Sequence, residues 1–336
     1  MPLHAAGKQR AYGSLGMAEI QTFSIIDLHP TPADMAAVVL RGLEQRPRQL
    51  PAWLLYDQQG SLLFEEICKQ PEYTLKRTEL ELLQKHANSF CAQIPANSLV
   101  LEFGAGSAEK VGPLLQALSN PAYVALDISA RHLQEAGKRL QAKFTSVPML
   151  GICADYSRAL ELPLSTELSQ RCRLGFFPGS SLGNFEPAEA TAFLMRLKQL
   201  LGPNGALLIG IDQPRPQAQL EAAYNDAAGF SAAFARNLLL RLQRELNAEV
   251  DPWGFSYKAE WQSEQQRIAM ALVSNGEQRL QLLGQEVIFK PGEIFITEYS
   301  YKYSPKAFQS LAASAGWSSQ QRHCDAADSY SLHLLV

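Results

Sequence analysis

Two glycines and two carboxylates stand at the ends of successive apolar runs, and their types and spacing suit a nucleoside-binding site. The run at 99–103 breaks at Gly104 and Gly106, and the next apolar run ends in Asp127. Glycines let the backbone approach a ligand closely, and a carboxylate at the tip of the next strand can accept both ribose hydroxyls. Asp155 follows the third apolar run, where it could accept from an adenine amino group.

The residues around these glycines favour one class of cofactor. A dinucleotide-binding loop has a third glycine three residues after the second, but Glu109 occupies that position. Glu102 and Glu109 would repel a pyrophosphate, yet they suit a ligand that carries a sulfonium and an ammonium group. We therefore expect S-adenosylmethionine as the cofactor. The alternative is that Asp127 and Asp155 only cap the helices that follow, since Asp is a common N-cap residue.

Composition indicates an intracellular enzyme. The 336 residues carry a formal net charge of −3 and no basic run, which argues against nucleic acid as the main partner. No stretch approaches the ~20 apolar residues that span a bilayer, and no signal-type apolar core is visible. The five cysteines and six histidines show no metal-ligand spacing. We expect a cytoplasmic monomer with a small-molecule substrate, no metal, and no membrane or nucleic-acid partner.

Strands and helices alternate from Ser98 to Asp212, which predicts a parallel, doubly wound sheet. After a stretch of long helices and short strands, the chain closes with a helix at 305–315 and an antiparallel pair of strands. We expect an α/β, Rossmann-like, seven-stranded methyltransferase fold with a second α+β substrate domain. The predicted elements of the sheet region are strands at 98–103, 122–127, 148–153, 173–178 and 205–211, and helices at 107–118, 130–143 and 187–200.

The uneven organisation of the chain predicts two domains. Residues 91–212 and 301–336 form the methyltransferase domain, whereas residues 18–90 and 213–300 form the substrate-binding domain. Residues 1–17 are expected to be a disordered extension. Ligands of open α/β sheets bind beyond the carboxyl ends of the strands, so we expect the substrate between the two domains.

Polar residues in two later segments are candidates to hold the methyl acceptor. Asn184 lies in a glycine-rich loop after the fourth strand and offers both a donor and an acceptor, although it could instead cap the helix at 187–200. In the strand near 295–303, period-two alternation places Glu298 and Ser300 on one face with Ile296 and Lys302. A carboxylate and a hydroxyl two residues apart can bind a polar ring, although a half-exposed strand often carries such residues.

Several motifs together resemble the histidine N-alpha-methyltransferases of ergothioneine biosynthesis, which make hercynine. The similarity covers the chain from about Ile25 to Val336. The motifs that carry it are Leu55-Tyr56-Asp-Gln-Gln-Gly60-Ser-Leu-Leu-Phe64-Glu, Pro71-Glu72-Tyr73, Glu102-Phe-Gly104-Ala-Gly106-Ser-Ala-Glu-Lys110, Gly183-Asn184, Tyr224-Asn-Asp-Ala-Ala-Gly229 and Glu298-Tyr-Ser300.

The resemblance implies a role for each matching residue. The cofactor would contact Gly104, Lys110, Asp127, Asp155 and Tyr156. Tyr56 and Asn184 would surround the reacting amine, and Tyr73, Asn184 and Tyr224 would hold the carboxylate of the amino acid. Glu298, Ser300 and Met270 would contact the imidazole ring, although the sequence pattern around Met270 by itself predicts a core residue.

The implied reaction is the methylation of a neutral α-amine in three rounds. The protein would chiefly align nitrogen, methyl carbon and sulfur, which contributes up to ~7–11 kcal/mol in well-oriented systems. Three alternatives remain open on the sequence: methylation of another amino acid such as tryptophan or tyrosine, a nicotinamide oxidoreductase, and a cofactor-binding module without catalysis.

Overall fold

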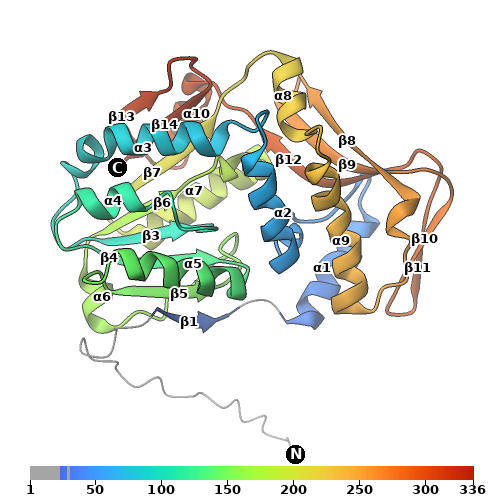
Figure 1. Ribbon diagram of the computed structural model, residues 1–336, viewed down its shortest axis with the longest axis horizontal. Coiled ribbons are helices and arrows are strands. Elements are labelled where there is room, and N and C mark those ends of the chain that lie inside the picture. The colour runs from blue at the N-terminus through green and yellow to red at the C-terminus, as the bar shows by residue number, and fades with distance from the viewer. Residues whose placement is uncertain (1–22, 29–30) are drawn as a thin grey trace, which may run out of the picture.

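The centre of the computed structural model, which describes residues 23–28 and 31–336, is an eight-stranded sheet (Figure 1). Its first six strands are parallel, β14 runs antiparallel to its neighbour β7, and β13 runs antiparallel to β14. From edge to edge they are β1 (Ser24–Asp27), β5 (Met149–Cys153), β4 (Ala122–Asp127), β3 (Leu99–Phe103), β6 (Arg173–Phe177), β7 (Ala206–Asp212), β14 (Tyr330–Leu335) and β13 (Ser319–Cys324).

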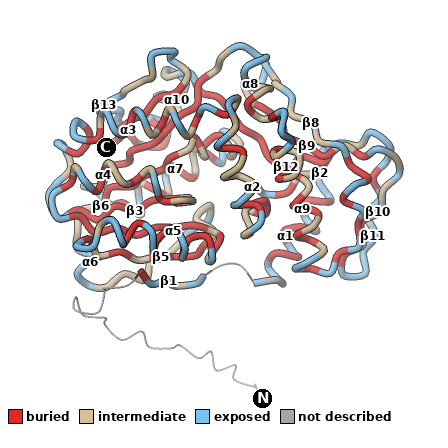
Figure 2. The backbone as a smooth tube through the Cα atoms, in the orientation of Figure 1, coloured by how far each residue is buried: buried red, intermediate tan, exposed pale blue. Residues whose placement is uncertain are grey.

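Helices cover both faces of this sheet, which explains why its central strands are mostly apolar. Alternate residues of β3 belong to two different apolar clusters: Val100 packs toward α3, α4 and α5, whereas Leu101 packs toward α6, α7 and α10. Figure 2 shows β3 and β4 as strands that are buried along their whole length. The helices are α3 (Leu75–Cys91), α4 (Gly112–Ala117), α5 (Ala130–Lys143), α6 (Thr166–Gln170), α7 (Pro187–Leu201) and α10 (Pro305–Ser314).

A smaller four-stranded sheet with its own helices lies beside the large sheet (Figure 1). Its order is β2 (Arg48–Gln49), β12 (Ile294–Tyr301), β9 (Arg267–Ser274) and β8 (Phe255–Gln262). The associated elements are α1 (Pro32–Glu44), α2 (Gln58–Lys69), α8 (Gln217–Tyr224), α9 (Phe230–Leu246), the hairpin β10 (Gln278–Leu282) and β11 (Gln285–Phe289), and the short 3-10 helices η2 (Ala52–Leu55), η3 (Ser181–Asn184) and η4 (Pro252–Gly254).

Two elements of the predicted substrate-binding part belong to the large sheet instead. β1 pairs with β5 and adds an eighth strand to the predicted seven, and α3 packs against α4 and β14. The apolar residues Ile25 and Leu83 explain this placement, because both pack into the cluster on that face of the sheet. The predicted extension at 1–17 lies outside the described residues.

The first helix of the sheet region is shorter than predicted. The prediction was 107–118, but α4 begins at Gly112. Gly106 and Ala108 have positive φ angles of 52° and 56°, so this part of the chain forms a turn and not a helix. Pro113 then stands in the first turn of α4, where its missing N–H is no loss.

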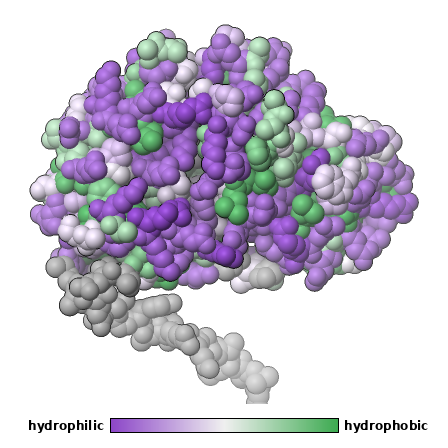
Figure 3. All heavy atoms as spheres, viewed as in Figure 1, coloured by the Kyte–Doolittle hydropathy of each residue, from purple (hydrophilic) through white to green (hydrophobic). Residues whose placement is uncertain are grey.

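The face of the molecule drawn in Figure 3 carries mostly hydrophilic residues. Figure 3 shows one face, on which apolar residues occur only in small groups. Among residues 23–28 and 31–336, no helix is long and apolar enough to cross a lipid bilayer.

Candidate active site

The carboxyl ends of β3, β4, β5 and β6 open into a cavity of about 730 Å³, and a smaller cavity of about 60 Å³ adjoins it. The larger cavity is lined by Gly104, Lys110, Asp127, Asp155 and Tyr156. The smaller one is lined by Tyr224, Met270 and Ser300. Four further residues, Tyr56, Tyr73, Asn184 and Glu298, line both cavities. All twelve residues that the sequence singles out therefore lie at one joined site.

Gly104 begins the turn after β3 in a conformation that favours glycine. Its φ is +75°, and a Cβ there would lie 2.8 Å from the hydroxyl oxygen of Tyr156. Asp127, at the end of β4, accepts the N–H of Gly106 at 2.9 Å and that of Ser129 at 3.0 Å. These bonds fix the turn against β4 and orient the Asp127 carboxylate. Asp127 does not itself cap α5, because Ser129 is the N-cap residue.

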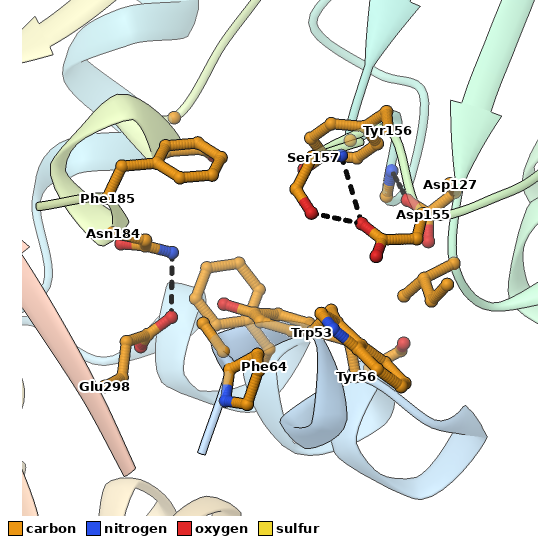
Figure 4. Close-up of a pocket in the computed structure, with 18 of the residues that line it drawn as sticks. Trp53, Tyr56, Phe64, Asp127, Asp155, Tyr156, Ser157, Asn184, Phe185 and Glu298 are labelled. Carbon is orange, nitrogen blue, oxygen red and sulfur yellow. Dashed lines mark hydrogen bonds between the residues drawn. The ribbon is translucent and has the colours of Figure 1, made fainter. Parts of the chain in front are cut away.

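Asp155 has one carboxylate oxygen that accepts a backbone hydrogen bond and one that accepts none from the described residues. Its Oδ1 accepts the backbone N–H of Ser157 at 3.0 Å (Figure 4). Its Oδ2 lies 3.2 Å from Nε of Arg158, but this buried oxygen accepts no hydrogen bond from the described residues. The next helix, α6, begins only at Thr166, so Asp155 caps no helix. A buried acceptor of this kind fits an amino group such as that of adenine.

The acidic residues of the glycine loop do not face the cavity, which corrects one argument from the sequence. Glu102 is fully buried and accepts the hydroxyl of Tyr123 at 2.5 Å, and Glu109 pairs with Lys76 at 2.9 Å. Neither lines the larger cavity, because Glu102 points into the packed sheet and Glu109 toward α3. The carboxylates that do line it near the turn are Asp127 and Asp155.

Lys110 is already neutralised by a buried partner. Its Nζ lies 2.6 Å from the Glu79 carboxylate of α3, whose side chain is fully buried. Burial lowers the pKa of Lys110, but attraction by Glu79 outweighs it and raises the pKa. Glu79 also accepts the N–H of Gly179 with both oxygens, at 2.9 and 3.1 Å. Glu79 thus joins the glycine loop to the loop at 178–184.

Asn184 binds a carboxylate and caps no helix. Glu186 is the N-cap of α7 and forms a capping box with Glu189, so Asn184 has no capping role. Its Nδ2 donates to Oε1 of Glu298 at 2.7 Å (Figure 4). The close approach of η3 to β12 requires Gly183, since a Cβ there would lie 2.6 Å from the carbonyl oxygen of Tyr301.

Glu298 lies after an irregularity in β12 that alternation alone did not predict. The register against β9 shifts between Ile296 and Glu298. Such a bulge changes which face later side chains point to. Ile296 therefore packs in the apolar cluster with Tyr299 and Tyr301, and not on the face of Glu298 and Ser300 as predicted. Burial raises the pKa of Glu298 to about 8, opposed by the positive charge of Lys302.

Aromatic rings form one wall of both cavities. The ring centroids of Tyr56 and Phe64 lie 5.6 Å apart, and the two rings are edge to face. The centroids of Phe64 and Tyr73, and those of Tyr73 and Tyr224, lie 6.0 Å apart, also edge to face. In Figure 4, Trp53, Tyr56 and Phe64 lie between the two aspartates and the Asn184–Glu298 pair. Burial, reinforced by Glu298, raises the pKa of Tyr56 well above its usual value, so Tyr56 remains a neutral phenol.

The structure adds lining residues that the sequence did not single out. Trp53, Phe64 and Phe185 line the larger cavity. Phe64 stands within the motif that begins at Leu55 and could have been found from the helical spacing of α2, whereas nothing in the sequence marks Trp53 or Phe185. In the part of the chain that the structure describes, no group of three or more His, Cys, Asp or Glu residues could hold a metal ion.

A parallel sheet that ends in an antiparallel hairpin, with carboxylates at the ends of β4 and β5, is the architecture of an S-adenosylmethionine-dependent methyltransferase. Residues 35–336 match the profile of a family described as histidine-specific, SAM-dependent methyltransferases. The chain therefore belongs to that family.

Similar proteins come from bacteria and fungi. A histidine N-alpha-methyltransferase of Mycolicibacterium smegmatis is 35% identical over 90% of this chain and 97% of its own length. One of Mycobacterium tuberculosis is 35% identical over 83% of this chain and 87% of its own length. A 4-dimethylallyltryptophan N-methyltransferase of Claviceps purpurea is 27% identical over 83% of this chain and 88% of its own length.

Proposed function

We propose that this protein transfers three methyl groups from S-adenosylmethionine to the α-amine of L-histidine and so forms hercynine. The observation that carries the proposal is the half-buried Asn184–Glu298 pair where the two cavities join. The amide oxygen of Asn184 suits an amine, and the carboxylate of Glu298 suits a ring N–H. The cofactor and the ring of the amino acid can then occupy opposite sides of the same pair.

The larger cavity has groups that fit the cofactor. Gly104 allows close approach, and Asp127 would accept the ribose hydroxyls. Oδ2 of Asp155, which lies 3.2 Å from the exposed Arg158 and accepts no hydrogen bond from the described residues, would accept the adenine amino group. Tyr156 lies against Gly104 and completes this wall. Lys110 would act at the edge of the site, since its charge is paired with Glu79. When bound, S-adenosylmethionine supplies an electrophilic methyl group on a sulfonium.

Asn184 and Tyr56 would position the reacting amine. Because Nδ2 of Asn184 donates to Glu298, the amide oxygen is left to accept an amine N–H. Tyr56 stays a phenol and cannot remove a proton as a phenolate. The amine would therefore have to enter neutral. Its nitrogen lone pair would form the new bond to the methyl carbon while the bond from that carbon to sulfur breaks and sulfur keeps the electron pair. After the first and second transfers the surplus proton on nitrogen would leave to water.

The aromatic wall suits an amine that gains methyl groups and loses N–H donors. A trimethylated ammonium makes no hydrogen bond, but it is attracted to aromatic faces by about 0.5–2 kcal/mol. The rings of Tyr56, Phe64 and Tyr73 form a connected edge-to-face series beside the amine position. Successive methylation therefore does not require the amine to keep one rigid hydrogen bond.

The remaining contacts would fix the two ends of histidine. Tyr73 and Asn184 would donate to its carboxylate, and Tyr224, whose hydroxyl is hydrogen-bonded to Ser300 at 2.9 Å, would pack beside it. Glu298, Ser300 and Met270 would surround its imidazole. A carboxylate that accepts an imidazole N–H makes a charge-assisted bond, which an apolar ring cannot replace. We further propose that residues 18–90 and 213–300 supply the substrate-binding part of the protein, except for β1 and α3, and that residues 91–212 and 301–336 supply the methyltransferase part.

Incubation with S-adenosylmethionine and each of histidine, tryptophan and tyrosine tests the proposal, with product masses as the readout. A gain of three methyl groups on histidine alone supports it. Methylation of tryptophan or tyrosine in preference to histidine would overturn the substrate, and failure to methylate any amino acid would overturn the activity.

A further inference from the structure

Lys302 is a fully buried lysine that contacts two residues of the proposed ring and carboxylate sites. It directly follows β12 and comes two residues after Ser300. Its side chain is 0% exposed. Its Nζ lies 2.7 Å from Oδ2 of Asp212, 2.7 Å from Oγ of Ser300 and 2.6 Å from the hydroxyl oxygen of Tyr224. Asp212 stands at the end of β7 and also pairs with Arg215.

The surroundings keep this lysine charged. Burial lowers the pKa of Lys302, but attraction by Asp212 and its hydrogen bonds outweigh burial and raise the pKa. An ammonium group has three N–H donors and no acceptor. Two of these donors are engaged by the hydroxyl oxygens of Tyr224 and Ser300, at 2.6 and 2.7 Å, and Nζ also forms an ion pair with Asp212 at 2.7 Å. Both hydroxyl oxygens, of Ser300 and Tyr224, must therefore act as acceptors toward Lys302.

This arrangement determines how many hydroxyl hydrogens remain for a ligand. Ser300 and Tyr224 are also hydrogen-bonded to each other at 2.9 Å. One of the two hydroxyl hydrogens is used in that bond, so only one remains to donate to a ligand. A phenol is a stronger acid than an aliphatic alcohol, so Tyr224 is the better donor of the two. The remaining O–H belongs to Ser300, which lines the smaller cavity with Glu298.

We propose that Lys302 is a positioning residue that sets ring specificity, because it makes Ser300 a hydrogen-bond donor opposite the acceptor Glu298. The inference rests on the proposed function, which places the substrate ring between these two residues. Such a site matches a ring with one N–H and one unprotonated nitrogen, which is a neutral imidazole. An imidazolium has two donors and no acceptor, and an indole offers no acceptor to Ser300. A buried hydroxyl left without an acceptor loses its hydrogen bond to water with no replacement, which weakens binding about tenfold or more.

The test compares histidine with 3-(2-thienyl)alanine, whose five-membered ring has neither an N–H nor a basic nitrogen. The readouts are kcat and KM for histidine, the inhibition constant of the analogue, and the dissociation constant of S-adenosylmethionine. In Lys302→Met the KM for histidine is expected to rise about tenfold or more, while kcat and cofactor affinity change little. The ratio of the analogue's inhibition constant to the KM for histidine is expected to fall by a similar factor.

The ratio separates specific positioning from general loosening of the site. If Lys302 only supports the fold, binding of histidine and of the analogue will weaken together, and an unchanged ratio would overturn the inference. The exposed Lys258, which pairs with Glu260 on β8, provides the control, and Lys258→Met should leave every readout unchanged.

A second variant guards against misfolding, since Lys302→Met leaves Asp212 with one cationic partner fewer in a buried place. Asp212→Asn combined with Lys302→Met removes both charges, and the same loss of discrimination is expected. If this folded double variant still discriminates between histidine and the thienyl analogue as the unmodified protein does, the inference is overturned. If the unmodified protein does not methylate histidine, the proposed function fails instead, and the two failures are therefore distinguishable.

Discussion

Glu298 is a carboxylate in a place where ionisation is unfavourable. It is 7% exposed, its pKa is raised to about 8 by burial, and its Oε1 accepts one hydrogen bond from Asn184. A ring N–H placed against this carboxylate would favour its charged form. The residue is therefore suited to respond to a ligand, and its properties give two predictions.

Glu298→Ala should weaken histidine binding and leave cofactor binding intact. The loss of one hydrogen bond to a charged group costs about 1.5–3 kcal/mol, which corresponds to a rise of roughly tenfold to a hundredfold in KM. Steady-state kinetics with histidine and titration with S-adenosylmethionine provide the two readouts. The exposed Glu264, in the turn between β8 and β9, gives the control variant Glu264→Ala. Equal loss of histidine and cofactor binding would contradict the assignment.

The stability of the unliganded protein should depend on pH through Glu298. The pKa of this carboxyl rises from an ordinary value of 4.5 to about 8 on folding. Between these values the folded state binds more protons than the unfolded state, so the free energy of unfolding falls as pH increases. Urea denaturation across this range should show a steeper fall for the unmodified protein than for Glu298→Gln. Glu102 shares the same direction of shift, but it contributes equally to both proteins. Parallel curves would refute the prediction.

At the scale of elements, α3 and β12 bring the two halves of the site together. α3 contributes Glu79, which holds Lys110 of the glycine loop and Gly179 of the loop at 178–184. β12 contributes Glu298 from the other sheet, and its contact with η3 places Asn184 beside it. Loss of either contact should disturb the alignment of cofactor and amino acid.

Glu79→Gln should destabilise the fold, because it leaves the largely buried ammonium of Lys110 without its counter-ion. Removal of one member of a buried pair lowers the free energy of unfolding by about 3–5 kcal/mol. Because the side chain of Lys110 is 18% exposed, we expect a loss near the lower end of this range. Urea denaturation measures the change, with Glu81→Gln on the exposed side of the same helix as control. Lys110→Met added to Glu79→Gln should restore part of the stability. Equal stabilities of the Glu79 and Glu81 variants would be incompatible with this role.

The elements show where sequence patterns were sufficient and where they were not. The alternation of apolar runs and helices predicted β3 to β7 and the closing hairpin, because both faces of a parallel sheet must be apolar. The shift in β12 was not predicted, since one extra residue changes the side-chain face without altering the residue types. The pairing of Lys302 with Asp212 joins strands from two sheets, and no local pattern marks such a contact.

At the scale of the whole molecule, the two sheets divide the chemistry between them. The large sheet presents Asp127 and Asp155 at its carboxyl edge, and the smaller sheet presents Glu298 and Ser300. The twelve candidate residues could be named from the sequence because the motifs are specific. Their roles stay predictions, and the sequence did not reveal that β1 and α3 belong to the large sheet, because their partners lie far along the chain.

Deletion of residues 1–16 should leave the melting temperature unchanged. The segment is outside the described residues, and its sequence has no apolar periodicity that would pack on the domain. Differential scanning fluorimetry of the full chain and of a chain that begins at Met17 measures the effect. A large drop in melting temperature would show that this prediction is wrong.

We propose that the two cavities direct every methyl group to the α-amine while Glu298 and Ser300 hold the ring. Tandem mass spectrometry of the product from histidine and S-adenosylmethionine tests this placement, because fragmentation locates the methyl groups. We expect all three to leave together as trimethylamine and the imidazole fragment to be unmodified. A methyl group retained on the imidazole fragment would show instead that the ring had occupied the position assigned to the amine.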